Sequence, residues 1–423
     1  MKLNKFLLKL SSEIMNNSSK IIKNLQICNK CIMDTSDEEI SFDETGQCSH
    51  CISFYNSLKK NWTPGTKEVL KELDDIVVSM KEKQKNQEYD AIIGLSGGVD
   101  SSYLAYWARK EANLRLLAVH VDAGWNSDLA VRNIEEIVKK LDIQLFTEVV
   151  DWEAIKDVQT AFFKAGVANQ DTPQDHAFFS VLYSFAEKNN IKYVINGNNY
   201  TSESVLPVAW GHDAMDSVHM KDICRQHGGK KWKKFPFVST FKYHVFIPRI
   251  RKMQIISPLN YIDYKKMDAI KVLEEKLNWQ YYGGKHYESR FTKFFQSYWL
   301  PEKFGYDKRK AHLSSLILSE EITRDEALDE MKKNSYDKST IDQDINYICK
   351  KLDVKKEDFI CWMNEPNKKF SDYKNNVFIK KVIYSLIIEF SNLKSRVNIF
   401  SKVKYILARI KYLSLKILSK SKN

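Results

Sequence analysis

Short apolar runs alternate with longer amphipathic segments through the central part of the chain. The expected strands are the apolar runs at 89–95, 114–121, 143–150, 191–196 and 254–256. The helices expected between the first four are 102–111, 127–141 and 173–188. Nearly continuous apolar strands joined by helices are typical of a parallel sheet with both faces covered. The pattern therefore predicts an α/β fold built on a doubly wound parallel sheet.

Polar residues follow these strands where such a sheet binds ligands, because ligands gather at the carboxyl ends of parallel strands. After the second strand, backbone groups around Val121 are expected to hold adenine, with Asp122 or Asn126 facing the ribose or the substrate. Asp175 and His176 open a later helix and are expected to point toward the same cleft. A single aspartate or histidine is more often a helix cap or a surface group. Their convergence on one sheet edge favours a site.

The sequence SGGVDSS, at 96–102 directly after the first strand, has the features of a pyrophosphate-binding loop. Gly97 and Gly98 lack Cβ atoms, so backbone N–H groups can approach phosphate oxygens, and the serines add hydroxyl donors. The next helix would direct its positive end at the anion. A Walker-type loop needs a lysine where Val99 and Asp100 stand. The loop thus predicts ATP cleavage between the α and β phosphates; an ordinary Gly- and Ser-rich turn is the alternative.

Four of the seven cysteines form two CxxC pairs separated by sixteen residues, a spacing typical of a zinc ribbon. These cysteines are Cys28, Cys31, Cys48 and Cys51. Four thiolates leave no position open for water, so the metal is predicted to be structural. Disulfides are the competing explanation, and a reducing compartment is favoured because the N-terminal stretch lacks the pattern of a secretory signal.

At 423 residues the chain is long enough for one main domain with smaller additions. Its hydrophobic content of 43% and charged content of 28% are those of a soluble globular protein. No apolar run reaches the roughly 18 residues of a membrane-spanning helix. Residues 1–26 are expected to form an amphipathic lead-in helix. The sequence therefore predicts a cytoplasmic protein.

The net charge of +12 is concentrated at the C-terminus. Residues 377–423 contain eleven Lys or Arg and one Glu, which accounts for ten of the twelve net charges. The rest of the chain is nearly neutral, so nucleic acid is not an expected partner. From residue 399 apolar residues recur at steps of four and three, which predicts an amphipathic helix. Its expected uses are packing on the body, a short coiled coil, or peripheral contact with the inner face of an anionic membrane.

Taken together, these motifs resemble those of the N-acetyl sugar amidotransferases, which are PP-loop ATP pyrophosphatases of lipopolysaccharide, O-antigen and related surface-glycan biosynthesis. The resemblance runs from about residue 26 to about residue 335. The loop alone would indicate only the superfamily, whereas the cysteine ribbon and the segment at 283–317 point to the family. The matching segments are CNKCIMDTSDEEISFDETGQCSHC (28–51), GLSGGVDSSY (94–103), AVHVDAGWNS (118–127), VVDWE (149–153), NGNN (196–199), NYIDY (260–264) and GGKHYESRFTKFFQSYWLPEKFGYDKRKAHLSSLI (283–317).

The resemblance implies that AMP is transferred to the oxygen of a sugar acetamido group and that ammonia then displaces AMP to leave an acetamidino group. The implied ligands are ATP, Mg²⁺, a structural Zn²⁺ and a nucleotide-activated N-acetyl sugar. The residues expected to bind ATP are Ser96, Gly97, Gly98, Val99, Asp100, Ser101, Ser102, Val121 and Asn198. The residues expected to contact the substrate are Asp122, Trp125, Asn126, Asn199, Glu203, His286, Glu288 and Arg290. The expected catalytic residues are Asp100, Asp175, His176, Lys285 and Lys293.

Within these sets, Asp100 is expected to orient the loop or to ligate Mg²⁺. Lys285, Arg290 and Lys293 are candidates for neutralising phosphate charge. The alternative for this segment is a charged helix that packs on the sheet through its phenylalanines.

Ammonia is expected to come from another protein, because none of the other three cysteines lies in a Gly-rich nucleophile elbow. The resemblance implies a separate glutaminase subunit and a cyclase-like subunit that channels ammonia. The predicted domains are a lead-in helix at 1–26, a zinc ribbon at 27–60, a PP-loop domain at 61–262, a helical substrate or partner region at 263–365 and a basic tail at 366–423.

Two other functions are open at this point. Enzymes of tRNA thiolation and lysidine synthesis share the loop and often carry zinc ribbons. A non-catalytic scaffold that binds ATP and recruits partners is the third hypothesis, although an intact SGGVDS loop argues against it.

Overall fold

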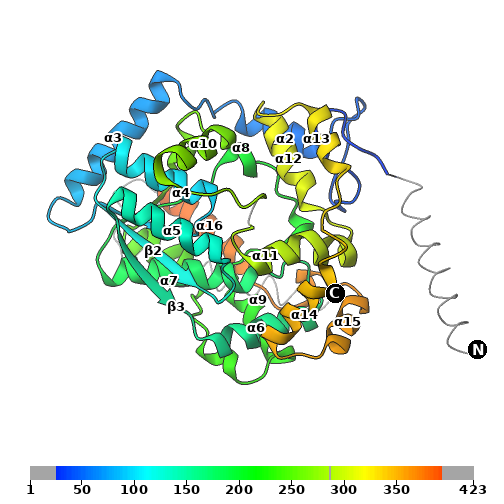
Figure 1. The fold of residues 1–423 in the computed structure, drawn as a ribbon. Coiled ribbons are helices and arrows are strands. Elements are labelled where there is room, and N and C mark those ends of the chain that lie inside the picture. The colour runs from blue at the N-terminus through cyan, green and yellow to red at the C-terminus, as the bar shows by residue number, and fades with distance from the viewer. Residues whose placement is uncertain (1–24, 285–286, 393–423) are drawn as a thin grey trace, which may run out of the picture.

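Five parallel strands form one sheet, in the order β3-β2-β1-β4-β5, of which β2 and β3 are labelled in Figure 1. The computed structural model describes residues 25–284 and 287–392. The strands are β1 (Ala91–Gly94), β2 (Leu116–Asp122), β3 (Gln144–Val149), β4 (Tyr193–Ile195) and β5 (Gln254–Ile256). The chain builds outward from β1 to β3 and then returns to place β4 on the other side of β1. The strand order therefore reverses between β1 and β4, and ligands of such sheets bind at that point.

Helices cover both faces of the sheet, which confirms the predicted doubly wound fold. Successive strand residues face opposite sides, so Ile93 joins one core and Ile92 the other. The helices on the Ile93 side are α3 (Lys67–Lys83), α4 (Val99–Tyr106), α5 (Asp128–Leu141) and α10 (Lys266–Leu277). The helices on the Ile92 side are α6 (Trp152–Ala165), α7 (Thr172–Lys188) and α9 (Ser217–His227).

The five predicted strands are confirmed, each to within two residues at either end. The helix expected at 102–111 begins earlier, at Val99, and continues as the π-helix η2 (Trp107–Glu111). Helix α6 was not predicted, although its start and end carry clear signals. The Asp151 side chain accepts a hydrogen bond from the Ala154 N–H at the start, and Gly166 takes a left-handed conformation at the end.

A third core joins the cysteine cluster to the helices beyond residue 289. Phe163, Phe291, Trp299 and Phe359 are fully buried in it, which confirms the predicted helical C-terminal region. These helices are α11 (Arg290–Phe294), η7 (Phe295–Phe304), α12 (Lys308–Leu318), α13 (Arg324–Met331), α14 (Ile341–Leu352) and α15 (Lys356–Asn364). The remaining helical segments before α16 are α2 (Ser49–Ser53), η1 (Phe54–Leu58), α8 (Tyr200–Glu203), η3 (Val208–Trp210), η4 (Lys231–Lys234), η5 (Lys242–Ile250), η6 (Pro258–Asn260) and η8 (Phe370–Asp372).

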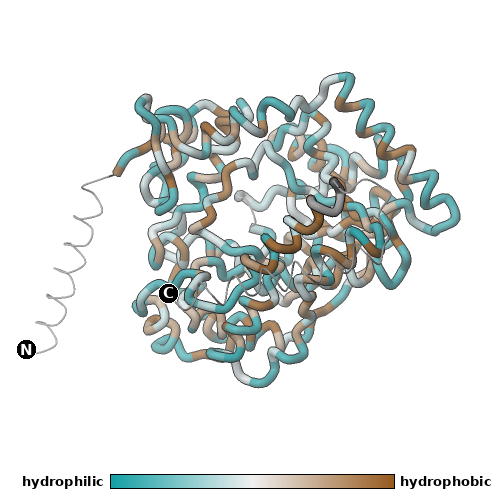
Figure 2. The backbone as a smooth tube through the Cα atoms, turned by 180° about the vertical axis from the view of Figure 1, so that it is seen from behind, coloured by the Kyte–Doolittle hydropathy of each residue, from teal (hydrophilic) through white to brown (hydrophobic). Residues whose placement is uncertain are grey.

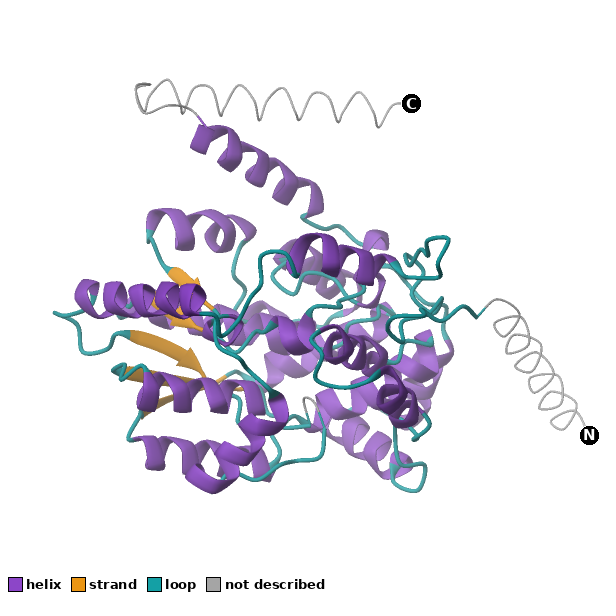
Figure 3. Cartoon of the chain, turned by 90° about the horizontal axis from the view of Figure 1, so that it is seen from above, coloured by secondary structure: helices purple, strands orange, loops and turns teal. Residues whose placement is uncertain are grey.

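Helix α16 (Val377–Asn392) ends the described part of the chain and packs against η5. It projects from the body in Figure 3 and is largely hydrophobic in Figure 2. Its side chains Phe378, Ile379, Tyr384 and Ile388 are 45–59% exposed. Within the described residues, no helix combines the length and the apolar character needed to cross a membrane. The helices predicted at 1–26 and from 399 onward lie almost wholly outside the described residues.

Candidate active site

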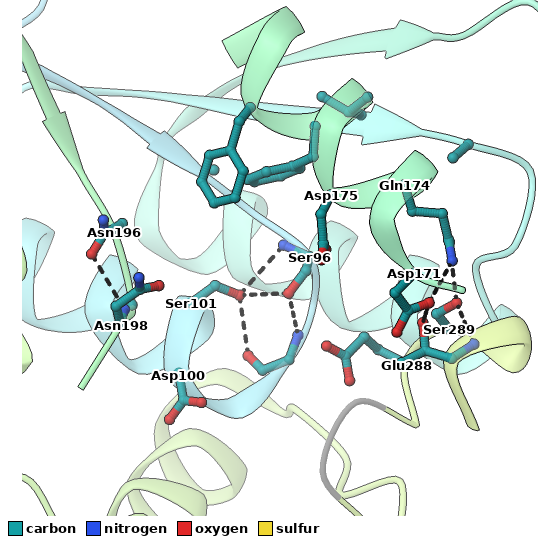
Figure 4. A pocket seen from close by; sticks show the side chains of 18 of the residues that line it. Ser96, Asp100, Ser101, Asp171, Gln174, Asp175, Asn196, Asn198, Glu288 and Ser289 are labelled. Carbon is teal, nitrogen blue, oxygen red and sulfur yellow. Dashed lines mark hydrogen bonds between the residues drawn. The ribbon is translucent and has the colours of Figure 1, made fainter. Parts of the chain in front are cut away.

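A cleft of about 360 Å³ opens at the carboxyl ends of β1, β2 and β4 (Figure 4). The loop after β1 forms one wall, α7 forms another, and the start of α11 closes a third side. The volume lies in the range of sites for small molecules. The segments that follow the strands thus converge on one cleft at the reversal of strand order, as expected from the sequence.

The loop between β1 and α4 is held in shape by its own serine hydroxyls. Ser96 Oγ and Ser101 Oγ lie 3.0 Å apart, and the Gly98 N–H donates to Ser96 Oγ at 3.2 Å. Gly97 has a φ of +80°, and a Cβ atom there would lie 2.7 Å from the Ala130 carbonyl oxygen. Only glycine fits this turn. The turn places the N-terminus of α4 at the cleft, where backbone N–H groups suit phosphate oxygens.

Aromatic residues from the segment after α10 hold the loop backbone from behind. Trp279 Nε1 donates to the Gly97 carbonyl at 3.0 Å, and the Val99 N–H donates to the Tyr282 hydroxyl at 3.0 Å. Trp279 belongs to the same core as the sheet, at 1% exposure. The core that supports the loop therefore extends beyond residue 262.

Asp100 is oriented by a buried tyrosine. The Tyr264 hydroxyl donates to Asp100 Oδ1 at 2.5 Å. Burial, together with the nearby Asp100 carboxylate, raises the pKa of Tyr264 well above its usual value. The hydroxyl therefore keeps its proton and stays a donor, so the carboxylate is fixed at the rim of the loop (Figure 4).

One side of the cleft is apolar. Phe178, Phe179 and Tyr183 of α7 line it together with Val121 from β2. A Cβ atom at Gly94 would lie 2.3 Å from Phe178 Cζ, so a glycine at the end of β1 lets this ring pack on the strand. Flat rings and aliphatic groups beside a phosphate-type loop suit a purine base.

His120 and Asn126 form a hydrogen-bonded pair on the β2 side of the cleft. His120 Nδ1 donates to the Leu95 carbonyl at 2.8 Å, which leaves Nε2 as an acceptor. Asn126 Nδ2 donates to that Nε2 at 2.9 Å. The protein thus uses the amide nitrogen of Asn126, and the amide oxygen is the group that this residue offers to a ligand.

Asp171, at the start of α7, is the most deeply buried carboxyl group of the cleft lining. Thr292 Oγ1 donates to Asp171 Oδ1 at 3.0 Å, and Gln174 Nε2 donates to the same oxygen at 2.9 Å. Burial raises the pKa of Asp171 to about 6, against the opposing influence of Lys308. A carboxyl group that titrates near neutral pH can exchange protons with a substrate, which makes Asp171 a candidate acid or base.

The raised pKa of Asp171 predicts how stability changes with pH. An unfolded aspartate titrates near pH 3.9, so between about pH 4 and pH 6 the folded protein holds a proton that the unfolded chain has lost. As the pH rises from about 4 to about 6, the free energy of unfolding of the wild type should fall by up to about 3 kcal/mol relative to that of Asp171→Asn. Urea unfolding of both proteins at pH 4.5 and pH 7.5 measures this; an equal difference at the two pH values would contradict it.

Twelve of the predicted site residues line the cleft. They are Ser96, Gly98, Val99, Asp100, Ser101, Val121, Trp125, Asn126, Asp175, Asn198, Glu203 and Glu288. Seven others lie outside its lining, namely Gly97, Ser102, Asp122, His176, Asn199, Arg290 and Lys293. Lys285 and His286 lie outside the described residues. The roles assigned to the lining residues stay proposals, whereas several of the others need correction.

His176 does not point into the cleft, so that expectation is wrong. The side chain is fully buried, with Nδ1 2.7 Å from the Ala214 carbonyl, to which it donates. Nε2 accepts a hydrogen bond from the Val238 N–H at 3.0 Å. Burial lowers the pKa of His176 to about 4, so the ring is neutral and joins two loops. The adjacent residue on the helix, Asp175, faces the cleft instead.

Asp122 and Asn199 shape loops next to the cleft instead of lining it. Asp122 Oδ1 accepts a hydrogen bond from the Gly124 N–H at 2.7 Å. Asn199 is 2% exposed and caps α8, because its Oδ1 accepts from the Ser202 N–H at 2.9 Å. Both are short polar side chains bound to nearby backbone, which a sequence does not distinguish from ligand contacts.

Arg290 and Lys293 turn away from the cleft, so neither is placed to neutralise phosphate. Arg290 pairs with Asp344 at 3.1 Å and stacks on Tyr347, 3.6 Å from the ring centre. Lys293 is exposed and lies over the Tyr287 ring. Both sit on the outer face of α11, whose inner face supplies Thr292 to the cleft. The helical spacing of this segment therefore decides which of its polar residues can reach a ligand.

Among the described residues, the cations that line the cleft are Lys266 and Lys308, and neither was predicted from the sequence. Asp171, Thr292 and Gln296 were not predicted either. Lys308 lies inside the segment at 283–317 on which the family resemblance partly rests. Asp171 precedes a proline-initiated helix. These two sequence positions were the available signals for Lys308 and Asp171. Neither signal shows which of several lysines or aspartates faces the cleft.

The four paired cysteines form one buried cluster. The Sγ atoms of Cys31 and Cys48 lie 3.6 Å apart, as do those of Cys48 and Cys51, and the Cys28 and Cys51 atoms are separated by 3.8 Å. A tetrahedron with zinc–sulfur distances near 2.3 Å has edges of about 3.8 Å. The Cys48 N–H also donates to Cys28 Sγ at 3.2 Å. The cluster can therefore hold one metal ion, as its spacing predicted.

The cysteine ribbon docks on the C-terminal helices. Arg324 of α13 donates to the carbonyls of Cys28 and Cys31, with Nη2 and Nε at 3.0 Å. The Ile32 N–H donates to Ser314 Oγ of α12 at 3.2 Å. These bonds join the ribbon to the helix whose first residue is Lys308. The ribbon therefore supports α12, which supplies Lys308 to the cleft, although none of the described ribbon residues lines the cleft itself.

Comparison with known proteins places these parts in families. Residues 70–235 match the NAD synthase family, and residues 288–386 match the family of the LPS biosynthesis protein WbpG-like, C-terminal domain. The chain is a PP-loop protein with a WbpG-like C-terminal domain. Both matches agree with the resemblance to N-acetyl sugar amidotransferases. The WbpG-like match extends to residue 386, beyond the limit near 335 expected from the motifs, and so includes most of α16.

Similar proteins cover parts of this PP-loop protein. The glutamine-hydrolysing GMP synthase of Vesicomyosocius okutanii is 30% identical over 34% of the chain, and that of Thermosipho melanesiensis is 31% identical over 35%. The chain spans 26% and 28% of those two proteins. The U34-tRNA thiolase NcsA of Methanococcus maripaludis, solved with its [4Fe-4S] cluster, is 15% identical over 70% of this chain and 89% of its own, at a TM-score of 0.31. The NH3-dependent NAD synthetase of Campylobacter jejuni covers 50% of this chain and 93% of its own, at 15% identity and a TM-score of 0.26.

Proposed function

We propose that this protein is an ATP-dependent amidotransferase that converts the acetamido group of a nucleotide-activated sugar into an acetamidino group, in LPS or related surface-glycan biosynthesis. The supporting observation is that the two segments of the chain that match these families both supply residues to one cleft. The PP-loop part supplies five residues of the loop, and the WbpG-like part supplies Glu288, Thr292 and Lys308. The five loop residues are Ser96, Gly98, Val99, Asp100 and Ser101. An ATP-activating loop thus faces residues of a domain found in glycan biosynthesis.

The atoms of the proposed reaction balance when the acetamido sugar, ATP and ammonia are the only reactants. The acetamido oxygen attacks the α-phosphorus of ATP, the bond to the β-phosphate oxygen breaks, and pyrophosphate leaves. Ammonia then adds to the carbon of the adenylylated imidate. AMP departs with the former amide oxygen, and the released protons pass to a base or to solvent. Activation is needed because an amide oxygen is a poor leaving group.

The residues of the cleft suit these two steps. The loop N–H groups and the N-terminus of α4 would bind the departing pyrophosphate. Asp100 and Asp175 supply carboxylates at the cleft, which are oxygen ligands of the kind that Mg²⁺ prefers, and the ion would neutralise phosphate charge when bound. Lys308 would stabilise charge on the AMP or sugar side. Asp171 would take a proton from the attacking ammonia, since its pKa is about 6.

The cysteine cluster is proposed to hold a structural Zn²⁺. The Sγ spacings of 3.6–3.8 Å match a single tetrahedral ion. An iron–sulfur cube has four iron atoms between its cysteine ligands and would hold them further apart. All four cysteines are fully buried and lie on the ribbon that docks on α12 and α13. A role in folding is therefore favoured over a role in the reaction.

Ammonia is proposed to come from a separate glutaminase, with a cyclase-like subunit that channels it. Among the described residues, Cys224 and Cys349 are buried thiols, and burial raises the pKa of Cys224 to about 12. Such a thiol is a poor nucleophile. If the purified chain alone used glutamine as fast as ammonium salts, the need for a separate glutaminase would be refuted.

Pyrophosphate release tests the proposed substrate class. The purified chain is incubated with ATP, Mg²⁺ and ammonium chloride, together with either nucleotide-activated N-acetyl sugars or total tRNA. Release should depend on one of the sugars and be insensitive to tRNA. Release that depends on tRNA alone would identify a tRNA-modifying enzyme, and ATP binding without release under any condition would favour the scaffold.

The exposed apolar side chains of α16, with the basic residues that follow, are proposed to contact an anionic membrane surface. Full-length protein should float with liposomes containing anionic lipid. A chain that stops at Asn376 should stay at the bottom of the gradient. This end point keeps the Asn376 N–H, which donates to Asp216 Oδ2 at 2.7 Å. Equal flotation of the two proteins would rule the membrane role out.

A further inference from the structure

A second, smaller cavity lies next to the cleft. Its volume is about 140 Å³, enough for a few water-sized molecules. Its lining combines small and aromatic side chains with two acidic and two basic ones. The small and aromatic residues include Ala168, Ala209, Phe304, Tyr306 and Phe370, and the charged residues are Glu38, Glu39, Lys368 and Lys369. No step of the proposed reaction has used these residues.

His219 of α9 lines this cavity with two unsatisfied ring nitrogens. It is 2% exposed, and among the described residues neither Nδ1 nor Nε2 has a hydrogen-bond partner. Its neighbours are rings: His212 lies 4.8 Å away and Tyr373 5.9 Å away, measured between ring centres. A buried polar group without a partner implies a small polar occupant. The cavity beside the ring has room for one.

The group that this cavity offers to an occupant is the neutral imidazole ring of His219. Burial lowers the pKa of His219 to about 4, helped by His212, so the ring carries no charge at neutral pH. An unprotonated nitrogen of the ring accepts a hydrogen bond from an N–H or O–H group. The two acidic and two basic side chains of the lining have no net charge together, and Lys369 Nζ and Glu38 Oε2 lie 2.7 Å apart. A small neutral molecule fits this lining better than an ion.

The cavity and the cleft share one wall residue, Asn169. Asn169 Oδ1 accepts a hydrogen bond from the Asp171 N–H at 3.1 Å. The residue shared by the two spaces is therefore bound directly to the backbone of the proposed base. On the cavity side, a Cβ atom at Gly211 would lie 3.5 Å from Asn169 Nδ2. Gly211 and the Asn169 side chain are therefore at ordinary contact distance, and Asn169 is the residue that separates the two spaces.

We propose that this cavity is the inlet through which ammonia reaches the adenylylated substrate, with His219 accepting a hydrogen bond from the incoming molecule. The proposal rests on the proposed amidotransferase function. Ammonia fits because it is small, neutral in its reactive form, and donates N–H groups to an imidazole nitrogen. A rotation of the Asn169 side chain, which separates the cavity from the cleft, would let ammonia pass and arrive beside Asp171, the group proposed to take its proton.

Gly211 offers a direct test, because its backbone is extended, with φ of −165° and ψ of 172°, and any residue can adopt it. Gly211→Leu would press a large side chain against Asn169 and hinder its rotation, whereas Gly211→Ala adds one methyl group at ordinary contact distance and serves as the matched control. His219→Phe keeps a ring in place and removes both nitrogens. These variants lie outside the residues proposed to bind ATP and sugar.

Two rates are measured for each variant: sugar-dependent exchange of pyrophosphate into ATP without ammonia, and product formation against ammonium concentration. Gly211→Leu should raise the KM for ammonium at least about tenfold and His219→Phe about threefold or more, with exchange unchanged and Gly211→Ala like wild type. Unchanged KM in folded Gly211→Leu and His219→Phe proteins would overturn the inlet alone. If the wild type showed no sugar-dependent exchange of pyrophosphate into ATP, the proposed function would be overturned, and the inlet with it.

Discussion

Asp100→Ala should lower the rate of ATP cleavage by about 100-fold or more, the usual effect of removing one fixed electrostatic group from a reaction centre. Asp100 sits at the first turn of α4, and the Tyr264 hydroxyl donates to it at 2.5 Å. The proposed mechanism needs this carboxylate to hold the Mg²⁺ that would neutralise the departing pyrophosphate. Sugar-dependent pyrophosphate release, measured at saturating ATP, gives the rate.

Three further variants separate charge from fold. Asp100→Asn keeps the hydrogen bond to Tyr264 but not the charge, and should be almost as slow as Asp100→Ala. Tyr264→Phe removes only the orienting bond and should cost roughly fivefold. Asp268→Ala changes an exposed carboxylate on α10 and should behave like wild type. Full activity of folded Asp100→Ala would contradict catalysis at this loop and favour the scaffold hypothesis.

Cys28→Ser should remove the bound metal and lower the midpoint of thermal unfolding by about 10 °C or more, because the binding energy of a structural zinc ion is folding energy. Cys28 is fully buried, and its Sγ accepts the Cys48 N–H at 3.2 Å. Its carbonyl also binds Arg324, so loss of the metal would loosen α13 as well. Metal content by mass spectrometry and unfolding by calorimetry give the two readings.

The matched control is Cys361→Ser, which changes an exposed cysteine on α15 and should leave both readings unchanged. Wild-type protein should contain about one zinc ion per chain. A wild type that binds iron and sulfide instead, or a Cys28→Ser protein as stable as wild type, would contradict a structural zinc ribbon.

The sheet was predictable because its strands are buried on both faces. Ile92 and Ile93 point to opposite cores, so an unbroken apolar run is the pattern that a central parallel strand requires. The cysteine cluster was predictable for a similar reason, since two CxxC turns bring four sulfurs to one point. In both cases the short-range sequence pattern and the three-dimensional arrangement carry the same information.

The loop was predictable as a motif, but its supports were not. Trp279 and Tyr282 bind the Gly97 carbonyl and the Val99 N–H from about 180 residues further along the chain. Their side chains are common core residues, and no local pattern marks them as loop ligands. Only the folded chain shows that the segment after α10 supports the loop proposed to bind ATP.

Polar residues on helices were the least predictable part of the site. Asp175 and His176 are adjacent, yet one faces the cleft and the other is buried between two loops. The rotation of α7 decides between them, because neighbouring residues on a helix point about 100° apart. Lys293 was expected to neutralise phosphate charge and Lys308 was not, yet the packing of α11 and α12 places only Lys308 at the cleft.

The central claim is that AMP is transferred to the acetamido oxygen of a sugar, and an oxygen label tests it most directly. A nucleotide-activated N-acetyl sugar with ¹⁸O in its acetamido group is incubated with the protein, ATP, Mg²⁺ and ammonium chloride. The proposed mechanism predicts that the label appears in AMP and is lost from the amidine product. Label that stays in the sugar while AMP forms, or that appears in inorganic phosphate, would contradict it.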